Sequence, residues 1–337
     1  MNDAAARRQF IAALGWGDAA VLALSGDAST RRFERLARPD GQTAVLISSA
    51  PGGGDTEAFV RIARLLREAG LSAPEVYGAD AGLGLILAED FGDICFGRLP
   101  RAAKDPAAFC AAGVEVLIAL HRRFDPLAAA AAGLPDFTPA VFLNQAALFL
   151  DSYLPFVAGA PDETTQRAFR TAWAAVLPLA YRVPRSLLLR DYHLGNIMRL
   201  PLRQGVAACG LLDFQDAGIG PVTYDLVSLL EDVRLPTDAA APALYAHYRA
   251  AFPAVDPADF ARSCAVLGAL RQCRILAVFA RLAEAQGRRD YLRFLPRAWQ
   301  LLDRRLGEPA LAPVAAWFAA HLPAARRIPA ALAMPAG

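Results

Sequence analysis

Three polar side chains stand where short apolar runs end abruptly. The segment LLLRDYHLGNI, residues 187–197, places Asp191 and Asn196 in one tight polar loop between apolar residues. Downstream, CGLLDFQD is a second apolar run, and Asp213 ends it. Short apolar runs of this kind are consistent with buried strands, and loops held between such strands commonly carry functional groups. We therefore expect Asp191, Asn196 and Asp213 to meet at one edge of a hairpin.

Phosphoryl transfer needs such a set of side chains. One carboxylate orients the attacking hydroxyl and accepts its proton, while an amide oxygen and a second carboxylate hold Mg²⁺ against the nucleotide phosphates. A lone Asp or Asn in a loop is more often a turn former or a helix cap, but the three together favour a functional site. His193 lies in the same loop, and we expect it to support the loop structurally.

The elements that must position these residues are of two kinds. Up to residue 90, strand signals alternate with turns around one helical pattern, in the order β-β-β-α-β-β, and Pro-Asp-Gly at 39–41 is a strong hairpin signal. We predict an α+β fold with a small antiparallel N-lobe, residues 1–90, and a larger, mainly helical C-lobe, residues 91–337. Helical periodicity in the second part covers residues 109–124, 139–155, 162–181, 236–252 and 256–286.

Composition narrows the class of protein. The 337 residues are 55% hydrophobic and carry a net charge of +2, so the chain can bury a large core and has no nucleic-acid footprint. Five widely spaced cysteines form no metal pattern and indicate buried or free thiols in a reducing compartment. The N-terminus lacks a signal-peptide core, and no run approaches the roughly 18 apolar residues of a membrane span. We expect a cytoplasmic monomer without membrane or nucleic-acid partners.

The stretch RDYHLGNIM, together with LLDFQDAGIGPVTYDLVSLL, resembles the aminoglycoside phosphotransferase-like family, which is related to the protein kinases. SGDASTRRFERL, LILAEDFGD and ARLAEAQGRRDYLRFLPRAW extend the resemblance over nearly the whole chain, and they are most similar to the N-acetylmuramate/N-acetylglucosamine anomeric kinases. The resemblance implies a protein-kinase-like two-lobe fold. It also implies ATP- and Mg²⁺-dependent phosphorylation of a small sugar at its anomeric hydroxyl.

The resemblance also implies roles for single residues. Asp191 corresponds to the catalytic aspartate, and Asn196 and Asp213 correspond to the magnesium ligands. Asp225 corresponds to a residue that braces the catalytic loop, although it also opens a helical pattern and could cap it. Arg190 is expected to have a structural role.

Nucleotide binding is implied for two segments. The loop before the second strand would lie over the phosphates: independently of the resemblance, Gly26 allows close backbone approach, and Ser29 and Thr30 can donate to phosphate oxygens. An ordinary hairpin turn is the alternative for this loop. The segment 88–90 would be the hinge whose backbone pairs with adenine. The expected nucleotide-binding residues are Ser25, Gly26, Ser29, Thr30, Arg31, Arg32, Ala88, Glu89 and Asp90.

One feature departs from the kinase pattern. Protein kinases use a lysine in the third strand to pair with the phosphates, but the matching strand TAVLISS has Ile47 or a neighbour there, and the only lysine is Lys104. Either Arg31 or Arg32 supplies the counter-charge, or Mg²⁺ and backbone donors suffice, or the protein is a pseudokinase. Neighbours on a strand point to opposite faces, so one arginine should face the site, and we expect it to be Arg32.

The sequence constrains the identity of the phosphate acceptor less than it constrains the reaction. An aminoglycoside, choline or another sugar is the alternative acceptor, but cationic acceptors need acidic or aromatic residues to hold them. The helices instead carry many arginines, which suit a neutral or anionic acceptor, including Arg262, Arg271, Arg274 and Arg281. Arg271 is a candidate substrate-binding residue. Asp216 could reach the substrate or could only end its strand.

Overall fold

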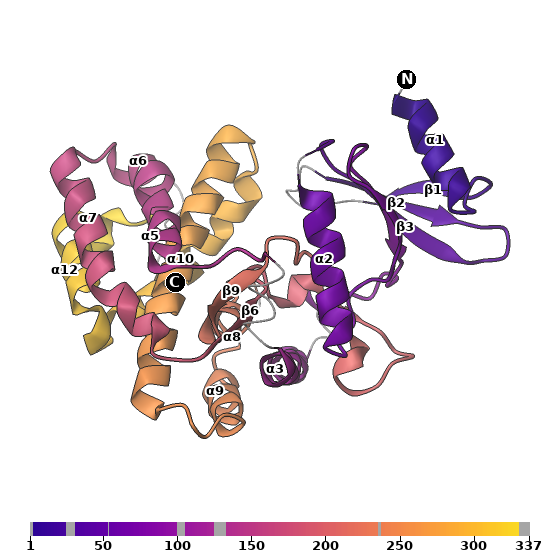
Figure 1. Cartoon of the computed structure of the whole chain (residues 1–337). Coiled ribbons are helices and arrows are strands. Elements are labelled where there is room, and N and C mark those ends of the chain that lie inside the picture. Colours follow the sequence, from indigo (N-terminus) through magenta and orange to yellow (C-terminus); the bar gives the residue numbers. More distant parts are fainter. Residues whose placement is uncertain are drawn as a thin grey trace. The chain divides into compact units, whose positions relative to one another are not determined.

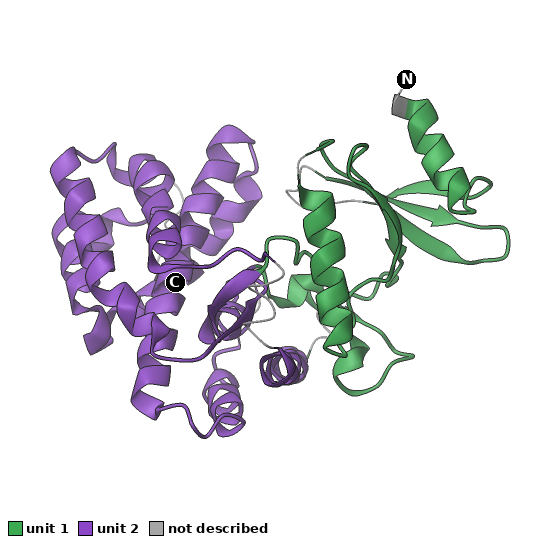
Figure 2. Ribbon diagram, viewed as in Figure 1, with its two compact units in different colours: residues 1–105, 191–217 green, residues 106–190, 218–337 purple. Residues whose placement is uncertain are grey.

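The computed structural model describes residues 3–24, 31–52, 54–99, 105–124, 133–234 and 237–329. The chain divides into two compact units (Figure 2). Unit 1 comprises residues 1–105 and 191–217, and unit 2 comprises residues 106–190 and 218–337. The prediction divides the sequence at a single point, near residue 90. In the structure, by contrast, the N-terminal unit also includes the segment 191–217, which holds the candidate catalytic residues.

Unit 1 is built on a five-stranded antiparallel sheet in the order β1-β2-β3-β5-β4 (Figure 1). The predicted order of strands around one helix is confirmed, and the predicted hairpin joins β2 to β3. A helix that precedes the first strand, α1 (Asp3–Ala13), was not predicted. The other elements are β1 (Ala20–Leu24), β2 (Arg32–Ala37), β3 (Thr43–Ser48), α2 (Asp55–Glu68), β4 (Val76–Asp80) and β5 (Leu85–Glu89).

The two faces of this sheet are covered differently. Because side chains alternate along a strand, Leu36 and Leu46 share one face, where they pack with Ile11 and Trp16 at the N-terminal helix. We call it the α1 face. The other face carries the cross-strand partners Phe33 and Ile47, and α2 lies on that side of the sheet (Figure 1).

A short hairpin completes unit 1. It consists of β7 (Ile197–Arg199) and β8 (Cys209–Leu211). The amide of Leu211 donates to the carbonyl of Ser72 at 2.7 Å, and the ring of Phe214 stacks on Phe59 of α2 with centroids 4.9 Å apart. These contacts fix the hairpin, and the two loops at its end, to the rest of the unit.

Unit 2 is mainly helical. Its core helix, α10 (Pro257–Ala285), is largely buried, and a two-stranded ribbon pairs β6 (Arg185–Leu188) with β9 (Gly218–Pro221). The ribbon strand β9 was not predicted as a strand. The remaining principal helices are α3 (Pro106–Arg123), α5 (Pro139–Leu148), α6 (Leu154–Ala158), α7 (Glu163–Val176), α8 (Thr223–Leu230), α9 (Ala241–Ala250), α11 (Leu295–Leu306) and α12 (Ala312–His321).

In the described part of the chain, two helical segments are long and apolar enough to cross a membrane by length and composition alone, although no apolar run of that length was predicted. They are α10 and the continuous helical stretch Pro139–Ala158. In α10, 83% of the apolar window is buried inside the structure, which is the pattern of a core helix. The stretch Pro139–Ala158 is 39% buried. Such helices are weak evidence for a membrane segment, because core helices of globular proteins meet the same criterion.

The five cysteines are buried free thiols, as predicted. Burial raises the pKa of Cys209 to about 11 and that of Cys110 to about 12. Thiols with such pKa values stay protonated near neutral pH and are poor nucleophiles. The cysteines therefore contribute to packing.

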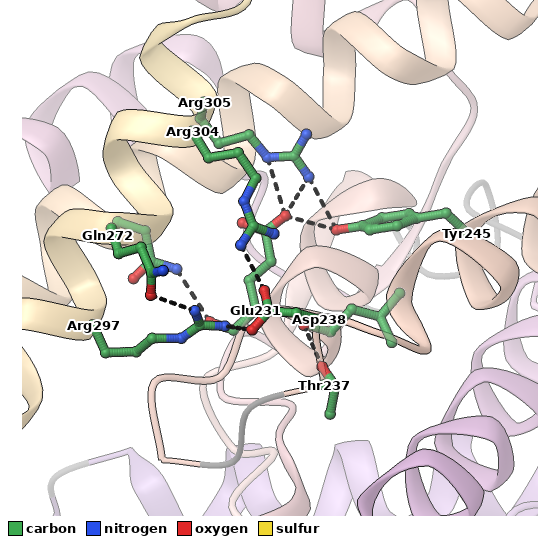
Figure 3. A network of polar contacts seen from close by, with 10 residues as sticks. Glu231, Thr237, Asp238, Tyr245, Gln272, Arg297, Arg304 and Arg305 are labelled. Carbon is green, nitrogen blue, oxygen red and sulfur yellow. Dashed lines mark hydrogen bonds and ion pairs between the residues drawn. The ribbon is translucent and has the colours of Figure 1, made fainter.

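A network of charged and polar side chains lies at the C-terminal end of α8 in unit 2 (Figure 3). The guanidinium of Arg305 donates through Nε to Glu231 at 3.0 Å and through Nη2 to the hydroxyl of Tyr245 at 3.2 Å. Glu231 is only 5% exposed. Gly268 of α10 makes room for this pair, since a Cβ there would lie 3.0 Å from both Arg305 Nε and Glu231 Oε2. Nearby, Arg304 pairs with Asp238 at a more exposed position.

We expect Arg305→Met to destabilise the protein by about 3–5 kcal/mol, because it leaves the buried charge of Glu231 without its partner. Arg304→Gln is the matched control on the neighbouring residue: its ion pair is half-exposed, and its loss should cost about 1 kcal/mol or less. Urea unfolding followed by circular dichroism measures both. Equal losses in the two variants would contradict the distinction between the buried and the exposed pair.

Candidate active site

The hairpin of unit 1 brings the three polar residues of the sequence motif together. The side-chain amide nitrogen of Asn196 donates to the backbone carbonyl of Asp191 at 2.8 Å and lies 3.4 Å from Asp213 Oδ2. The side chain of Asp213 is 41% exposed, so its carboxylate is accessible. The predicted meeting of Asp191, Asn196 and Asp213 at one end of a hairpin is confirmed.

Two residues of this site have an unusual backbone. Arg190 has a φ of 74° and Asp213 a φ of 60°, and they are the only non-glycine residues with positive φ in the part of the chain that the structure describes. This region of backbone space is sterically costly for residues with a Cβ. Such strain persists only where surrounding contacts enforce it, and it is concentrated at functional sites. One of the two strained residues directly precedes Asp191, and the other is itself a member of the set.

Asp225 supplies the contacts that hold the first strained residue. It is 1% exposed in α8, and its two carboxylate oxygens accept hydrogen bonds from the amides of Leu189, at 2.5 Å, and Arg190, at 3.0 Å. The N-cap position of α8 is Val222, and Asp225 is the third residue of the helix, in its first turn rather than at the cap. This geometry favours a role in holding the backbone just before Asp191 over helix capping.

The loop that holds Asp191 and Asn196 has further support within unit 1. His193 Nδ1 accepts a hydrogen bond from the amide of Gly195 at 3.1 Å, which fits the structural role expected for this histidine. The thiol of Cys95 lies 3.2 Å from the carbonyl of Gly195. A Cβ on Gly97 would lie 2.8 Å from the backbone of Gly195, so the two backbones touch. The sequence gives no signal for this contact, because it joins residues about one hundred positions apart.

Arg31 contacts the candidate metal ligand. Its Nη2 donates to Asp213 Oδ1 at 2.6 Å and its Nη1 to Gln215 Oε1 at 2.7 Å, while Gln215 Nε2 donates back to Asp213 Oδ1 at 3.1 Å. The guanidinium also lies over the ring of Phe33, 5.8 Å from its centroid. Phe33 is the cross-strand partner of Ile47. Arg31 therefore brings positive charge to the face of the sheet that carries Ile47, a residue of the strand on which Ile47 or a neighbour is expected in place of the kinase lysine. Sequence reasoning missed Gln215.

The expectation that Arg32 faces the site is wrong. Arg32 is the first residue of β2 and pairs with Ser48, so by strand alternation it shares the α1 face with Glu34 and Leu36. It lines a pocket there with Arg7 of α1. The expected asymmetry between the two arginines is present in the structure, but Arg31 is the residue directed at Asp213.

The predicted hinge residues end β5. Ala88 pairs with Val45 and Val76 across the two neighbouring strands, so its backbone is already engaged in the sheet. Asp90 is clamped by Arg35, whose Nε donates to Asp90 Oδ2 at 2.5 Å. Burial raises the pKa of Asp90, but the hydrogen bonds from Arg35 and from a backbone amide outweigh it and hold that pKa below its usual value.

Glu89, the third hinge residue, forms an ion pair with Arg203. Adenine pairing by segment 88–90 stays a prediction. The backbone of Asp90, just beyond β5, is the part of this segment best placed for it, because it lies outside the strand.

The remaining candidates are placed as follows. Asp216 is an exposed residue of unit 1. Arg271 is 5% exposed within unit 2, where its Nε donates to Ser228 Oγ at 2.8 Å and its Nη1 to the carbonyl of Glu231 at 3.3 Å, an arrangement that supports the end of α8. The predicted phosphate-loop residues Ser25, Gly26, Ser29 and Thr30, and the single lysine Lys104, lie outside the described residues.

The donor set suits a hard divalent cation. The amide nitrogen of Asn196 is engaged with Asp191 and Asp213, which leaves its Oδ1 as the oxygen ligand beside the accessible carboxylate of Asp213. Mg²⁺ is usually held by one or two protein oxygens together with substrate phosphates. Among the described residues no group of three or more His, Cys, Asp or Glu could hold a metal alone, so a cation here would be shared with a phosphate ligand.

The fold and this site define a class, the phosphotransferases with a protein-kinase-like fold. Solved structures of similar fold include the choline kinase LicA from Streptococcus pneumoniae, with a TM-score of 0.62, 14% identity and coverage of 93% of this chain and 99% of that one. A GDP complex of aminoglycoside 2'-phosphotransferase-IIIa has a TM-score of 0.60, 17% identity and coverage of 90% and 98%. The predicted kinase-like α+β fold is confirmed.

Residues 20–260 match the phosphotransferase enzyme family, and the chain belongs to that family. Curated relatives include the N-acetylmuramate/N-acetylglucosamine kinase of Caulobacter vibrioides, 32% identical over 96% of this chain and 98% of the relative. The protein of that name from Pseudomonas aeruginosa is 30% identical over 88% and 87%. The protein is a kinase that transfers a phosphoryl group to a hydroxyl acceptor, as the motifs predicted.

Proposed function

We propose that the protein is an ATP-dependent kinase of the anomeric hydroxyl of N-acetylmuramate and N-acetylglucosamine, acting as a monomer in the cytoplasm. The observation that carries the proposal is the contact of Asn196 with both Asp191 and Asp213, combined with similarity over nearly the full chain to relatives named for these substrates. In this reaction the sugar oxygen forms a bond to the γ-phosphorus of ATP, and ADP leaves.

Each residue of the site has a role in this proposal. Asp191 orients the sugar hydroxyl and accepts its proton. Asn196 Oδ1 and the Asp213 carboxylate would hold Mg²⁺, which when bound neutralises phosphate charge. Arg31 supplies the counter-charge that a lysine supplies in protein kinases, and its planar guanidinium suits two phosphate oxygens at once. Asp225 holds the strained backbone before Asp191.

A coupled ADP-release assay tests the proposed substrates. We expect turnover with N-acetylmuramate and N-acetylglucosamine, and none with kanamycin or choline. Phosphorus NMR of the product should show a phosphate ester on the anomeric carbon. Turnover only with a cationic acceptor would overturn the substrate assignment, and nucleotide binding without turnover on any acceptor would indicate a pseudokinase.

The two neighbouring arginines give a matched test of the counter-charge. Arg31→Ala should lower kcat/KM for ATP by about 10–100-fold, the range expected when a hydrogen bond to a charged group is lost. Arg32→Ala removes the same charge from the next position and should have a much smaller effect, because its side chain lies on the α1 face. Steady-state kinetics with varied ATP measures both. A larger loss in Arg32→Ala than in Arg31→Ala would contradict this assignment.

A further inference from the structure

A pocket lies on the α1 face of the sheet, away from the face that carries Phe33 and Ile47. Its volume is about 220 Å³, several times the roughly 30 Å³ that a water molecule occupies in the liquid. The site described above makes no use of it. Its polar lining residues come from three elements: Arg7 of α1, Arg32 and Glu34 of β2, Ser48 of β3, and Ser49 just after it.

The charge of this lining is positive. Arg7 Nη2 donates to Glu34 Oε2 at 2.5 Å, and Glu34 is 9% exposed, so this pair neutralises the buried carboxylate. Arg32 is exposed and forms no ion pair within the described ranges of the chain. Among the described residues, the pocket therefore has one guanidinium with no acidic partner and a second one whose charge is balanced.

The hydrogen-bond donors of the pocket also favour an anion. Ser48 is the direct cross-strand partner of Arg32, so its hydroxyl and the guanidinium rise side by side from one face of the sheet. Ser49 is already engaged, since its hydroxyl donates to the carbonyl of Gly84 at 3.2 Å. Leu83 and Leu85 add apolar surface to the lining. A guanidinium beside a hydroxyl is a donor set that recognises phosphate oxygens.

We propose that this pocket binds a phosphate group, as inorganic phosphate or as the phosphate ester of a small sugar, outside the active site. The guanidinium of Arg32 binds the negative charge of the phosphate, and the hydroxyl of Ser48 donates a neutral hydrogen bond. The Arg7–Glu34 ion pair forms a polar side of the pocket. The volume leaves room for a body attached to the phosphate. The proposal is independent of the kinase reaction, because it concerns the opposite face of the sheet.

Titration calorimetry of the full chain at low ionic strength tests the proposal with three ligands: inorganic phosphate, glucose 1-phosphate and uncharged glucose. We expect the two phosphates to bind and glucose not to bind. Arg32→Gln should weaken phosphate binding about tenfold or more, and Ser48→Ala about threefold, in line with the loss of a charged and of a neutral hydrogen bond. Tighter binding of glucose 1-phosphate identifies the ester as the occupant, and equal affinities identify the bare anion.

Arg31→Gln is the matched control, because it removes the same charge from the adjacent residue on the active-site side. Phosphate binding should persist in this variant. If Arg31→Gln abolishes binding and Arg32→Gln does not, the phosphate occupies the nucleotide site and the proposal is overturned. Absence of phosphate binding by the wild-type protein, or equal binding by wild type and Arg32→Gln, overturns it as well. Because every measurement here is of binding and none is of catalysis, this test can fail or succeed independently of the sugar-kinase assay.

Discussion

Asparagine in place of Asp191 is expected to lower kcat by about 10²–10⁴-fold, the usual contribution of a positioned general base, while the affinity for ATP stays near the wild-type value. The amide retains the size of the carboxylate but cannot accept the hydroxyl proton. The structure supports this separation of effects, because the backbone carbonyl of Asp191 still receives the hydrogen bond from Asn196. Single-turnover kinetics and titration calorimetry measure the two quantities.

Two outcomes would contradict the role of Asp191. Turnover close to wild type would remove it from catalysis. A parallel loss of turnover and of ATP affinity would indicate that the substitution disturbs the nucleotide site instead. Asp18→Asn is a control for the loss of one carboxylate, since Asp18 is an exposed residue of the same unit and should leave both quantities unchanged.

Asp213→Ala should lower both turnover and nucleotide affinity, which distinguishes a metal ligand from a general base. A carboxylate bound to Mg²⁺ acts in the ground state and in the transition state alike. We expect at least about tenfold weaker binding of the magnesium–nucleotide complex and a loss of about 10²-fold or more in kcat. Calorimetry with a non-hydrolysable ATP analogue, with and without Mg²⁺, measures the binding effect.

The magnesium dependence makes this second experiment decisive. If Asp213 holds the cation, Mg²⁺ should strengthen analogue binding in the wild-type protein and have little effect in Asp213→Ala. Asp213→Asn keeps the size of the side chain and one oxygen, so its magnesium effect should lie between those of the wild-type protein and Asp213→Ala. An unchanged magnesium effect in Asp213→Ala would mean that Asp213 is not a ligand.

The order of the strands of the five-stranded sheet and the meeting of the candidate catalytic residues could be predicted because both depend on local signals. The alternation of strands in unit 1, the Pro-Asp-Gly hairpin and the five helical stretches follow from apolar period and turn chemistry. Asp191 and Asn196 share the loop before one strand of a short hairpin, and Asp213 lies two residues beyond the end of the partner strand. Because the two strands are antiparallel, these positions lie at the same end of the hairpin.

The features that were missed depend on contacts between distant residues. Strand alternation requires Arg31 and Arg32 to face opposite ways, but only the position of α1 and of Asp213 decides which residue faces which way. The bridging role of Gln215 depends on Arg31, which is 184 positions away. The strand β9 is a Gly-Ile-Gly-Pro segment with little strand propensity, and it forms because β6 pairs with it.

The ion pair between Arg31 and Asp213 joins the proposed phosphate-binding residue to the proposed metal ligand. If Asp213 holds the cation as proposed, a divalent cation and the Arg31 guanidinium compete for the same carboxylate, so the cation alone would have to displace an existing partner. In the proposed role of Arg31, a nucleotide would offer the guanidinium a new set of oxygens and so lower the cost of that displacement. Nucleotide and cation should therefore bind with positive cooperativity, and by thermodynamic reciprocity each should tighten the other by the same factor. Arg31→Ala would relax this linkage and raise the affinity of the protein for the free cation.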